Sequence, residues 1–428
     1  MTTSSSKPKI VHLTREIGLS GGGNAALSMI SLIDELGYRQ SVIHQSGEGI
    51  NTQYSKSFKI PRGFIQNFLG FLERALFMRY PVRDDGTLIS SGVLSMPQRR
   101  LKKTLSKLIR NEEHTFVICH WINLGFISLS TLNRISKMRK VSLVIHLHDL
   151  WFLQDLAHQP KYAGYGKVPQ LPNWSLMSHP GLFQNIIQRK SRARKEKLRK
   201  RAIFSVSSKE LLHYLETSPE YSDVSKELNF ICIPMSLKYL LDGNLIKQEI
   251  AHKNFLLLIG NHSLRDRRKN LLSAINGYLI SEIKNKYPLF VVCDFDSMTK
   301  EEIKFFKEKN VLFFDILDHS DALYVMSQSR VTIVPSTFET FGLTIFEASI
   351  TAPLLGITSG AVSESLLSNL KMDFVSEDWD RAEAWDRLIE MDTSSLNFSQ
   401  KNLKILLNRE IEVSHQVQGA LKVLGEMN

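Results

Sequence analysis

The sequence has few residues that would cross-link the chain or break its regular structure. Its three cysteines, Cys119, Cys232 and Cys293, are far apart and form no Cys-x-x-Cys pair. This scarcity argues against a disulfide framework and a structural zinc site, and it favours a reducing compartment. With 13 Pro and 23 Gly in 428 residues, collagen-like and Pro-rich architectures are excluded as well.

Long hydrophobic runs are also missing. Residues 1–13 have a short polar lead and one apolar strand, without the apolar core of a signal peptide. No stretch of about 18 uncharged apolar residues occurs, so we expect no transmembrane helix. The expected location is the cytoplasm, with peripheral association at the inner face of the membrane as an open alternative.

Positive charge is in excess, because 54 Lys and Arg stand against 43 Asp and Glu for a net charge of +11. Such a surplus indicates attraction to an anionic partner. Its densest part is residues 186–201, with nine Lys or Arg and the single acid Glu196. This segment is either a solvated helix or a surface for anionic lipid headgroups. Nucleic-acid binding is not expected, because no aromatic residues are interleaved with the basic ones.

Short apolar runs alternate with helical segments in two series along the chain. This pattern is typical of parallel sheets covered on both faces, and the length fits two or three domains of about 150 residues. The first series of strands is expected at 10–13, 41–44, 116–119, 142–147, 203–206 and 230–233, and the second at 255–259, 289–293, 311–314, 331–334 and 354–357. We predict an α/β protein of two Rossmann-like domains, residues 1–236 and 237–400, followed by terminal helices over 401–428 that pack back toward the first domain.

A run of three glycines, Gly21 to Gly23, lies between the first strand and a helix expected over 24–36. Glycines there let the backbone approach a phosphate, and a helix N-terminus favours an anion. A flexible turn is an equally good interpretation. The run is not Gly-x-Gly-x-x-Gly and no acid ends the second strand, so a nicotinamide site is poorly supported.

Two glutamates follow the strand over 331–334. Glu339 lies in the loop and Glu347 about one turn into the next helix, with seven residues between them. Both carboxylates can face the carboxyl edge of the sheet, where open α/β sheets bind ligands, and they can accept hydrogen bonds from sugar hydroxyls. The spacing alone fits equally well an ordinary helix start with acids near its positive end.

Several ordered motifs together resemble a known family. Ser336-x-x-Glu339-x-Phe341-Gly342-x-x-x-x-Glu347-Ala348 is similar to the signature of glycosyltransferase family 4, retaining enzymes of the GT-B architecture. In the first half, Cys119 to Ile127 and Leu147 to Trp151 resemble segments of the bacterial branch that builds exopolysaccharides of the colanic-acid type. The resemblance covers nearly the whole chain, and it implies two Rossmann-like domains that face each other across a cleft.

The resemblance also implies roles for individual residues. His148 and Glu339 would lie beside the donor sugar as catalytic residues, and Glu347 would hold the ribose of the nucleotide. The diphosphate and sugar would be bound by the basic pair, the glycine run and backbone groups of the second motif, namely Arg268, Lys269, Gly22, Gly23, Phe341, Gly342, Leu343 and Thr344. No metal and no cofactor are expected, since the nucleotide-sugar is a substrate.

The implied activity is transfer of a sugar, with retention, from a nucleotide-sugar to a saccharide or lipid-linked acceptor in surface polysaccharide or glycoconjugate synthesis. A hydrophobic stripe over 63–80 is typical of core packing, or it touches the lipid of such an acceptor. The chain departs from the family pattern at Asn261, where an Arg is usual, and at Ala352, where a Gly is usual. The alternative is therefore an inactive GT-B subunit that binds and regulates a partner enzyme.

Overall fold

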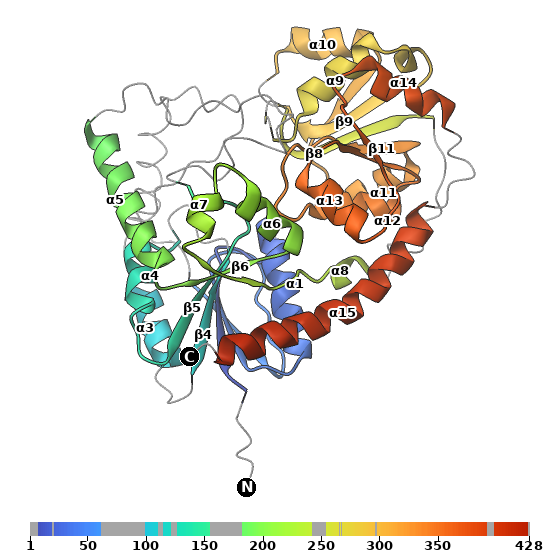
Figure 1. The fold of residues 1–428 in the computed structure, drawn as a ribbon. Coiled ribbons are helices and arrows are strands. Elements are labelled where there is room, and N and C mark those ends of the chain that lie inside the picture. The colour runs from blue at the N-terminus through green and yellow to red at the C-terminus, as the bar shows by residue number, and fades with distance from the viewer. Residues whose placement is uncertain are drawn as a thin grey trace.

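The chain folds around two separate parallel sheets, each flanked by helices (Figure 1). The computed structural model describes residues 7–18, 21–60, 99–109, 114–120, 126–154, 182–241, 254–264, 266, 268–295, 298–391 and 398–426. Within these residues, the strands form a seven-stranded and a six-stranded sheet. Every described helix is too short or too polar to cross a membrane.

The first sheet has the strand order β3-β2-β1-β4-β5-β6-β7, and all its neighbours are parallel. Its central strands are buried on both faces, which explains their near-continuous apolar sequences. The strands are β1 (Lys9–Leu13), β2 (Gln40–His44), β3 (Ser55–Lys59), β4 (Thr115–Cys119), β5 (Val141–His146), β6 (Ile203–Val206) and β7 (Asn229–Cys232). The helices are α1 (Gly21–Glu35), α3 (Arg99–Ile109), α4 (Leu129–Ile135), α5 (Leu182–Arg199), α6 (Lys209–Thr217), α7 (Ser222–Ser225) and α8 (Lys238–Leu241).

The second sheet has the order β10-β9-β8-β11-β12-β13 and is also parallel throughout. Its strands are β8 (Leu256–Ser263), β9 (Leu289–Asp294), β10 (Val311–Phe314), β11 (Val331–Val334), β12 (Leu355–Thr358) and β13 (Val375–Glu377). Its helices are α9 (Leu271–Ile280), η4 (Glu282–Asn285), α10 (Lys300–Glu308), α11 (His319–Gln328), α12 (Leu343–Thr351), α13 (Val362–Asn369) and α14 (Ala382–Glu390).

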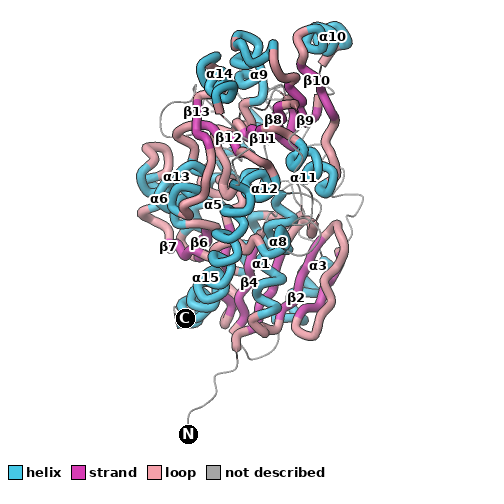
Figure 2. Tube along the Cα trace, turned by 90° about the vertical axis from the view of Figure 1, so that its right-hand side faces the viewer, coloured by secondary structure: helices cyan, strands magenta, loops and turns pink. Residues whose placement is uncertain are grey.

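The C-terminal segment is one long helix, α15 (Phe398–Glu426), where the sequence pattern suggested more than one. Its first half packs on the second sheet through Leu406, and its second half packs on the first sheet through Val413, Val417 and Leu421. Figures 1 and 2 show this helix running along both halves of the molecule. The helix therefore ties the two sheets together.

Both sheets reverse their winding direction near the centre. The chain turns outward from β1 to β2 on one side and to β4 on the other, and β8 lies in the same way between β9 and β11. At such a switch point the loops after the two central strands diverge and leave room for a ligand at the carboxyl edge. The segments after β1, β4, β8 and β11 are therefore the first places to look for a site.

Several predicted boundaries were wrong. The sequence pattern missed β3 and β13, because both are edge strands whose polar sequences lack an apolar run. The β8 strand continues to Ser263 instead of ending at Gly260. Helix α1 begins at Gly21, so the glycine run forms its first turn and is not a loop before it.

Candidate functional site

The switch point of the second sheet joins two loops into one unit. The Thr337 amide, in the loop after β11, donates to the Arg268 carbonyl, in the turn after β8, at 2.7 Å. Since β8 and β11 are neighbouring parallel strands, their carboxyl ends deliver both loops to the same edge. This hydrogen bond places the basic pair of one loop beside Glu339 of the other.

The centre of this unit is an ion pair between Lys269 and Glu339. The Lys269 Nζ atom lies 2.5 Å from Glu339 Oε1, and the two side chains are only 12% and 18% exposed. Burial by itself would raise the pKa of Glu339, but the charge and hydrogen bond of Lys269, aided by Ser336 and Arg268, lower it overall. Glu339 is therefore held as a carboxylate next to a cation at the sheet edge.

Arg268 is oriented by an acid that sequence reasoning missed. The Asp266 carboxylate is fully buried and accepts two bonds from the Arg268 guanidinium, at 3.2 and 2.7 Å, and one from the Arg268 amide at 3.0 Å. The Asp266 carbonyl also accepts from the amides of Lys269 and Asn270, which precede α9. Asp266 thus builds the turn that presents Lys269, while it engages the guanidinium of Arg268.

The start of helix α12 depends on Gly342. This residue has φ +78°, in the left-handed region that favours glycine, and an added Cβ would lie 3.1 Å from the Ile345 side chain. The Phe341 ring is buried and stacks on Phe346 with centroids 5.1 Å apart, so its side chain belongs to the core. Leu343 and Thr344 are half-buried in the first turn. Phe341 and Gly342 can therefore meet a ligand through their backbone groups alone, because the Phe341 ring is buried and Gly342 has no side chain.

Glu347 lies farther along α12 and pairs with a histidine that the sequence did not single out. Its Oε1 atom is 3.0 Å from Nε2 of His319, the first residue of α11. The hydrogen bond that His319 donates to Glu347 raises the pKa of His319, against a smaller opposing effect of burial. His319 follows β10 at the same edge of the sheet, and that position was the only signal available in the sequence.

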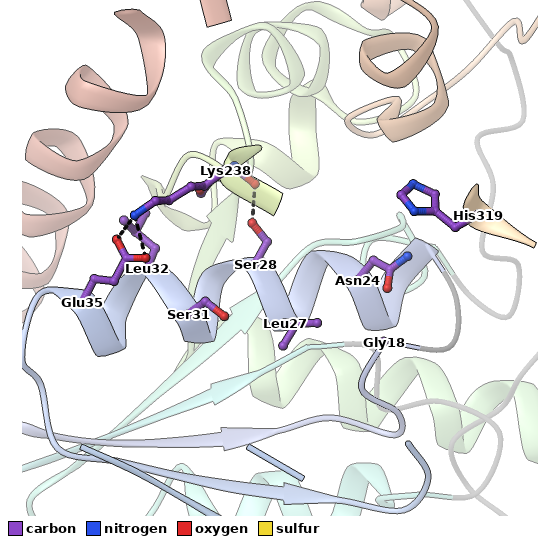
Figure 3. Close-up of a pocket in the computed structure, with 10 residues that line it drawn as sticks. Gly18, Asn24, Leu27, Ser28, Ser31, Leu32, Glu35, Lys238 and His319 are labelled. Atoms are coloured by element: carbon purple, nitrogen blue, oxygen red, sulfur yellow. Dashed lines mark hydrogen bonds and ion pairs between the residues drawn. The ribbon is translucent and has the colours of Figure 1, made fainter. Parts of the chain in front are cut away.

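His319 also lines a cavity of about 280 Å³ next to helix α1 (Figure 3). One face of α1 forms a wall of this cavity, and the opposite wall comes from α8 and α11; the lining residues are Gly18, Asn24, Leu27, Ser28, Ser31, Leu32, Glu35, Ser236, Lys238 and His319. Gly22 and Gly23 lie in the first turn of α1, between the lining residues Gly18 and Asn24. A Cβ on Gly23 would lie 3.2 Å from the Gly18 nitrogen, so the packing around this residue is tight. The cavity therefore lies between helix α1, whose first turn holds the glycine run, and His319, the partner of Glu347; Gly22, Gly23 and Glu347 themselves are not among its lining residues.

The first sheet contributes His148, two residues after β5. The Thr340 hydroxyl, next to Glu339, donates to the His148 carbonyl at 2.8 Å, and the Ser207 hydroxyl donates to the Thr340 carbonyl at 3.2 Å. The preceding Phe338 is buried in the core of the first sheet, with its ring 5.5 Å from that of Tyr214. The loop after β11 thus reaches across and joins His148 to the Glu339 segment.

Comparison with known proteins rests on structure. No protein-family model and no curated sequence matches the chain. Sucrose-phosphate synthase from Thermosynechococcus elongatus is 13% identical with a TM-score of 0.60, over 99% of this chain and 100% of that chain. A trehalose-6-phosphate structure from E. coli bound with UDP-2-fluoro glucose is 11% identical with a TM-score of 0.58, over 97% of this chain and 98% of that chain. WaaG, a glycosyltransferase involved in lipopolysaccharide biosynthesis, is 12% identical with a TM-score of 0.50, over 97% of this chain and 99% of that chain.

The chain has the GT-B fold. Two parallel-sheet domains with central switch points, matched over nearly the full length of each neighbour, confirm the fold class predicted from sequence. At 10–13% identity the likeness extends to the fold and no further.

Within this GT-B fold, the predicted residues fall into two groups. His148, Arg268, Lys269 and Glu339 are joined by contacts through Thr337 and Thr340. Glu347 belongs with His319, which lines the cavity beside α1, and Gly22 and Gly23 lie in the first turn of that helix. The ring of Phe341 is buried in the core of the second sheet.

Two departures from the family pattern can be located. Asn261 lies inside the extended strand β8 and not in a loop after it. Ala352 follows α12 with φ −80°, a conformation open to any residue, so the backbone does not require the glycine that is usual in the family. Among the residues that the structure describes, no group of three or more His, Cys, Asp or Glu is placed to hold a metal ion.

The basic segment 186–201 is less uniform than its sequence suggests. Lys195 of α5 is buried with its Nζ atom 3.9 Å from the centre of the Trp151 ring, and it donates to the carbonyls of Trp151 and Gln154. Arg199 donates to the carbonyls of Phe152 and Leu153. These two cations therefore stabilise the turn that follows His148, while Arg189, Lys190, Arg192, Lys197, Lys200 and Arg201 are exposed. The hydrophobic stripe over 63–80 lies outside the described residues.

Proposed function

We propose that this protein is a glycosyltransferase that moves a sugar from a nucleotide-sugar to a saccharide or lipid-linked acceptor. The observation that carries the proposal is the buried Lys269–Glu339 pair at the β8/β11 switch point, held against His148 by Thr340. A cation and a carboxylate side by side match the two parts of such a donor, an anionic diphosphate and a sugar rich in hydroxyl groups.

In this proposal the chemistry follows from where charge develops. Breaking the anomeric C–O bond leaves a nucleoside diphosphate with additional negative charge, and a fixed cation lowers the energy of that state. Lys269 supplies the cation, and the N-termini of α12 and α1 supply partial positive charge from their backbone dipoles. Glu339 and His148 bind the sugar, and Glu347 with His319 receives the ribose beside the α1 cavity. No metal or cofactor enters the proposal, and retention of configuration is taken from the sequence resemblance.

The donor class has support from one neighbour of the same fold, which is bound with UDP-2-fluoro glucose. A role in surface polysaccharide or glycoconjugate synthesis is supported by the sequence resemblance and by the fold shared with WaaG, which is involved in lipopolysaccharide biosynthesis. The exposed cations of α5 offer a surface for anionic lipid headgroups at the inner face of a membrane. Peripheral attachment there would bring the enzyme to a lipid-linked acceptor.

One observation favours the second candidate, an inactive GT-B subunit that binds and regulates a partner. Asp266 engages the Arg268 guanidinium with two hydrogen bonds. Of Arg268 and Lys269, Lys269 is therefore the one that forms an ion pair with Glu339. A donor site with a single cation binds a diphosphate more weakly than a site with two.

Donor turnover distinguishes the two candidates. A panel of nucleotide-sugars is first screened by thermal stabilisation, where a donor at 100 times its dissociation constant adds about 2.7 kcal/mol of stability. Release of nucleoside diphosphate is then measured for the wild type, Glu339→Gln and the control Glu383→Gln, which removes an exposed carboxylate of α14 in the same domain. We expect Glu339→Gln to lose roughly two to three orders of magnitude in turnover, with the control unchanged. Absence of turnover across the whole panel, despite stabilisation by a donor, would favour the regulatory subunit.

A further inference from the structure

Four polar side chains form a continuous chain of hydrogen bonds inside the first sheet and end at His148. Gln40 Oε1 lies 2.7 Å from His12 Nε2, and His12 Nδ1 lies 2.9 Å from His120 Nε2. His120 Nδ1 then lies 3.1 Å from His148 Nε2. The chain crosses from β2 through β1 to the end of β4 and reaches the segment after β5, so it follows the switch point of the sheet.

The orientation of the Gln40 amide is fixed independently of the histidines. Its Nε2 atom lies 3.1 Å from the carbonyl oxygen of Ile30, which can only accept, and 3.0 Å from the Ser55 hydroxyl. The Ser55 hydroxyl in turn donates to the Asp34 carboxylate, so it accepts from Gln40. The other end of the amide, which faces His12, is therefore the carbonyl oxygen, an obligatory acceptor.

That carbonyl sets the direction of every bond in the chain. His12 must donate from Nε2, and a neutral imidazole has only one N–H, so its Nδ1 accepts. His120 accordingly donates from Nε2 and accepts at Nδ1, and His148 donates from Nε2. Burial favours neutral rings throughout, since it lowers the pKa of His12 and His148 to about 4 and that of His120 well below its ordinary value.

We propose that Gln40, His12 and His120 are positioning residues that hold His148 as the Nε2–H tautomer and leave its Nδ1 lone pair as the acceptor for a hydroxyl of the bound sugar. His12 and His120 are buried, whereas the His148 ring is partly exposed beside the Thr340 loop. None of the described residues bonds to His148 Nδ1. The ring can then accept a hydrogen bond from a substrate hydroxyl but cannot donate one. The tautomer itself is independent of the proposed function, and only the identity of its ligand depends on it.

The tautomer is tested by nitrogen NMR of ¹⁵N-histidine-labelled protein, with His148 assigned from the signal lost in His148→Gln. In the wild type we expect a protonated Nε2 and an unprotonated Nδ1 at His148, His120 and His12. Gln40→Met removes the side-chain carbonyl. His12 Nε2 then has no partner, whichever of the two possible directions the hydrogen bonds between His12 and His148 take. The preference between the two tautomers of His148 should fall about ten- to a hundred-fold, so that both become visible.

Matched variants separate positioning from folding. In Gln40→Glu a protonated carboxyl still accepts from His12 and donates to Ile30, so the wild-type tautomer should return. His12→Phe keeps a ring next to His120 and removes both nitrogens, and it interrupts the chain at a second point if Gln40→Met does not fold. His146 bonds to Ser205 outside the chain, at 2.9 Å, and its tautomer should stay the same in all these variants, although its ring packs 4.6 Å from that of His148. A wild-type His148 protonated at Nδ1, or an unchanged single tautomer in both Gln40→Met and His12→Phe, would overturn the proposal.

Donor kinetics test whether the Nδ1 lone pair of His148 accepts a hydrogen bond from a hydroxyl of the donor sugar. We expect Gln40→Met to lower kcat/KM for the intact donor about ten-fold and to have no effect on the one deoxy analogue that lacks the hydroxyl bound by Nδ1. An equal loss for every deoxy analogue would disprove the hydroxyl contact. If no donor is turned over at all, the proposed function fails, while the NMR result still decides the tautomer.

Discussion

The two sheets bring differently charged groups to the loop after β11. On the second sheet, Lys269 pairs with Glu339, Arg268 with Asp266, and His319 with Glu347. On the first sheet, His148 ends a largely buried chain of neutral rings and an amide, and the neighbouring carboxylate of Asp149 is the charged group that acts on it. One side thus combines opposite charges, and on the other the hydrogen-bonded chain that reaches His148 carries no charge at neutral pH.

This difference suggests a division of labour in the proposed transferase. Paired charges suit the part of a donor that is itself charged, because a fixed cation attracts a diphosphate and a carboxylate orders sugar hydroxyls. Neutral acceptors suit hydroxyl recognition without adding charge near the bond that breaks. The contrast also predicts opposite responses to mutation and pH on the two sides.

Lys269→Met should give the largest effect, because it leaves the carboxylate of Glu339 without its main partner. We expect a loss of about 3 kcal/mol in stability by urea denaturation at pH 7, the lower end of the range for breaking a buried pair. The pKa of Glu339 should rise, since burial is then opposed by fewer favourable interactions. UDP affinity by calorimetry should fall about ten-fold, as one charge-assisted contact is lost.

The double variant Lys269→Met/Glu339→Gln is the control for this prediction. It removes both charges and leaves a neutral pair, so it should recover much of the stability lost in the single variant. Equal losses in the single and double variants would mean that the carboxylate is not stabilised by Lys269. The paired-charge description of this side would then be wrong.

The sequence was sufficient to predict the fold class but not the pairings that orient the site. Buried parallel strands carry apolar runs, so the central strands of both sheets were predictable. His12 and His120 are 108 residues apart and meet only because β1 and β4 are neighbours. Asp266 is one acid among several arginines, and its function depends on the turn that it builds. Such contacts depend on tertiary structure and leave no local pattern.

The basic segment shows a signal that was available and overlooked. Ile187, Ser191, Lys195 and Leu198 recur at helical spacing and are all buried. Reading that face of the helix would have set Lys195 apart from the exposed cations. A count of charges along a segment does not show which of them face solvent.

Mild acid should destabilise the first sheet through its histidines. The pKa of buried His12 is about 4 in the folded protein, against an ordinary value of 6.5, so the unfolded chain binds more protons between these values. Stability is therefore fully present above pH 6.5 and falls as pH drops towards 4. For His12 alone the loss between pH 7 and 5 is about 2 kcal/mol, measurable by hydrogen exchange of β1 and β4 amides.

His12→Phe tests whether His12 causes this slope of stability against pH. The variant removes the titrating group, so the loss of stability between pH 7 and 5 should become about 2 kcal/mol smaller. The exposed His415 of α15 is the matched control, and His415→Gln should leave the slope as it is. A slope that is the same in His12→Phe and the wild type would show that His12 is not neutral in the folded protein.

His319 should respond in the opposite direction and by a smaller amount. Its pKa is raised by the hydrogen bond that it donates to Glu347, so the folded state holds a proton more tightly than the unfolded chain. The pair therefore contributes stability below pH 6.5 and loses it as pH rises through the folded pKa. Because the His319 side chain is 45% exposed, the contribution is below about 1 kcal/mol. His319→Gln should lower stability more at pH 6 than at pH 8, measured by hydrogen exchange of β10 and β11 amides. Equal losses at both pH values would mean that His319 stabilises the second sheet as a neutral ring, and the contrast between the two sides would no longer hold.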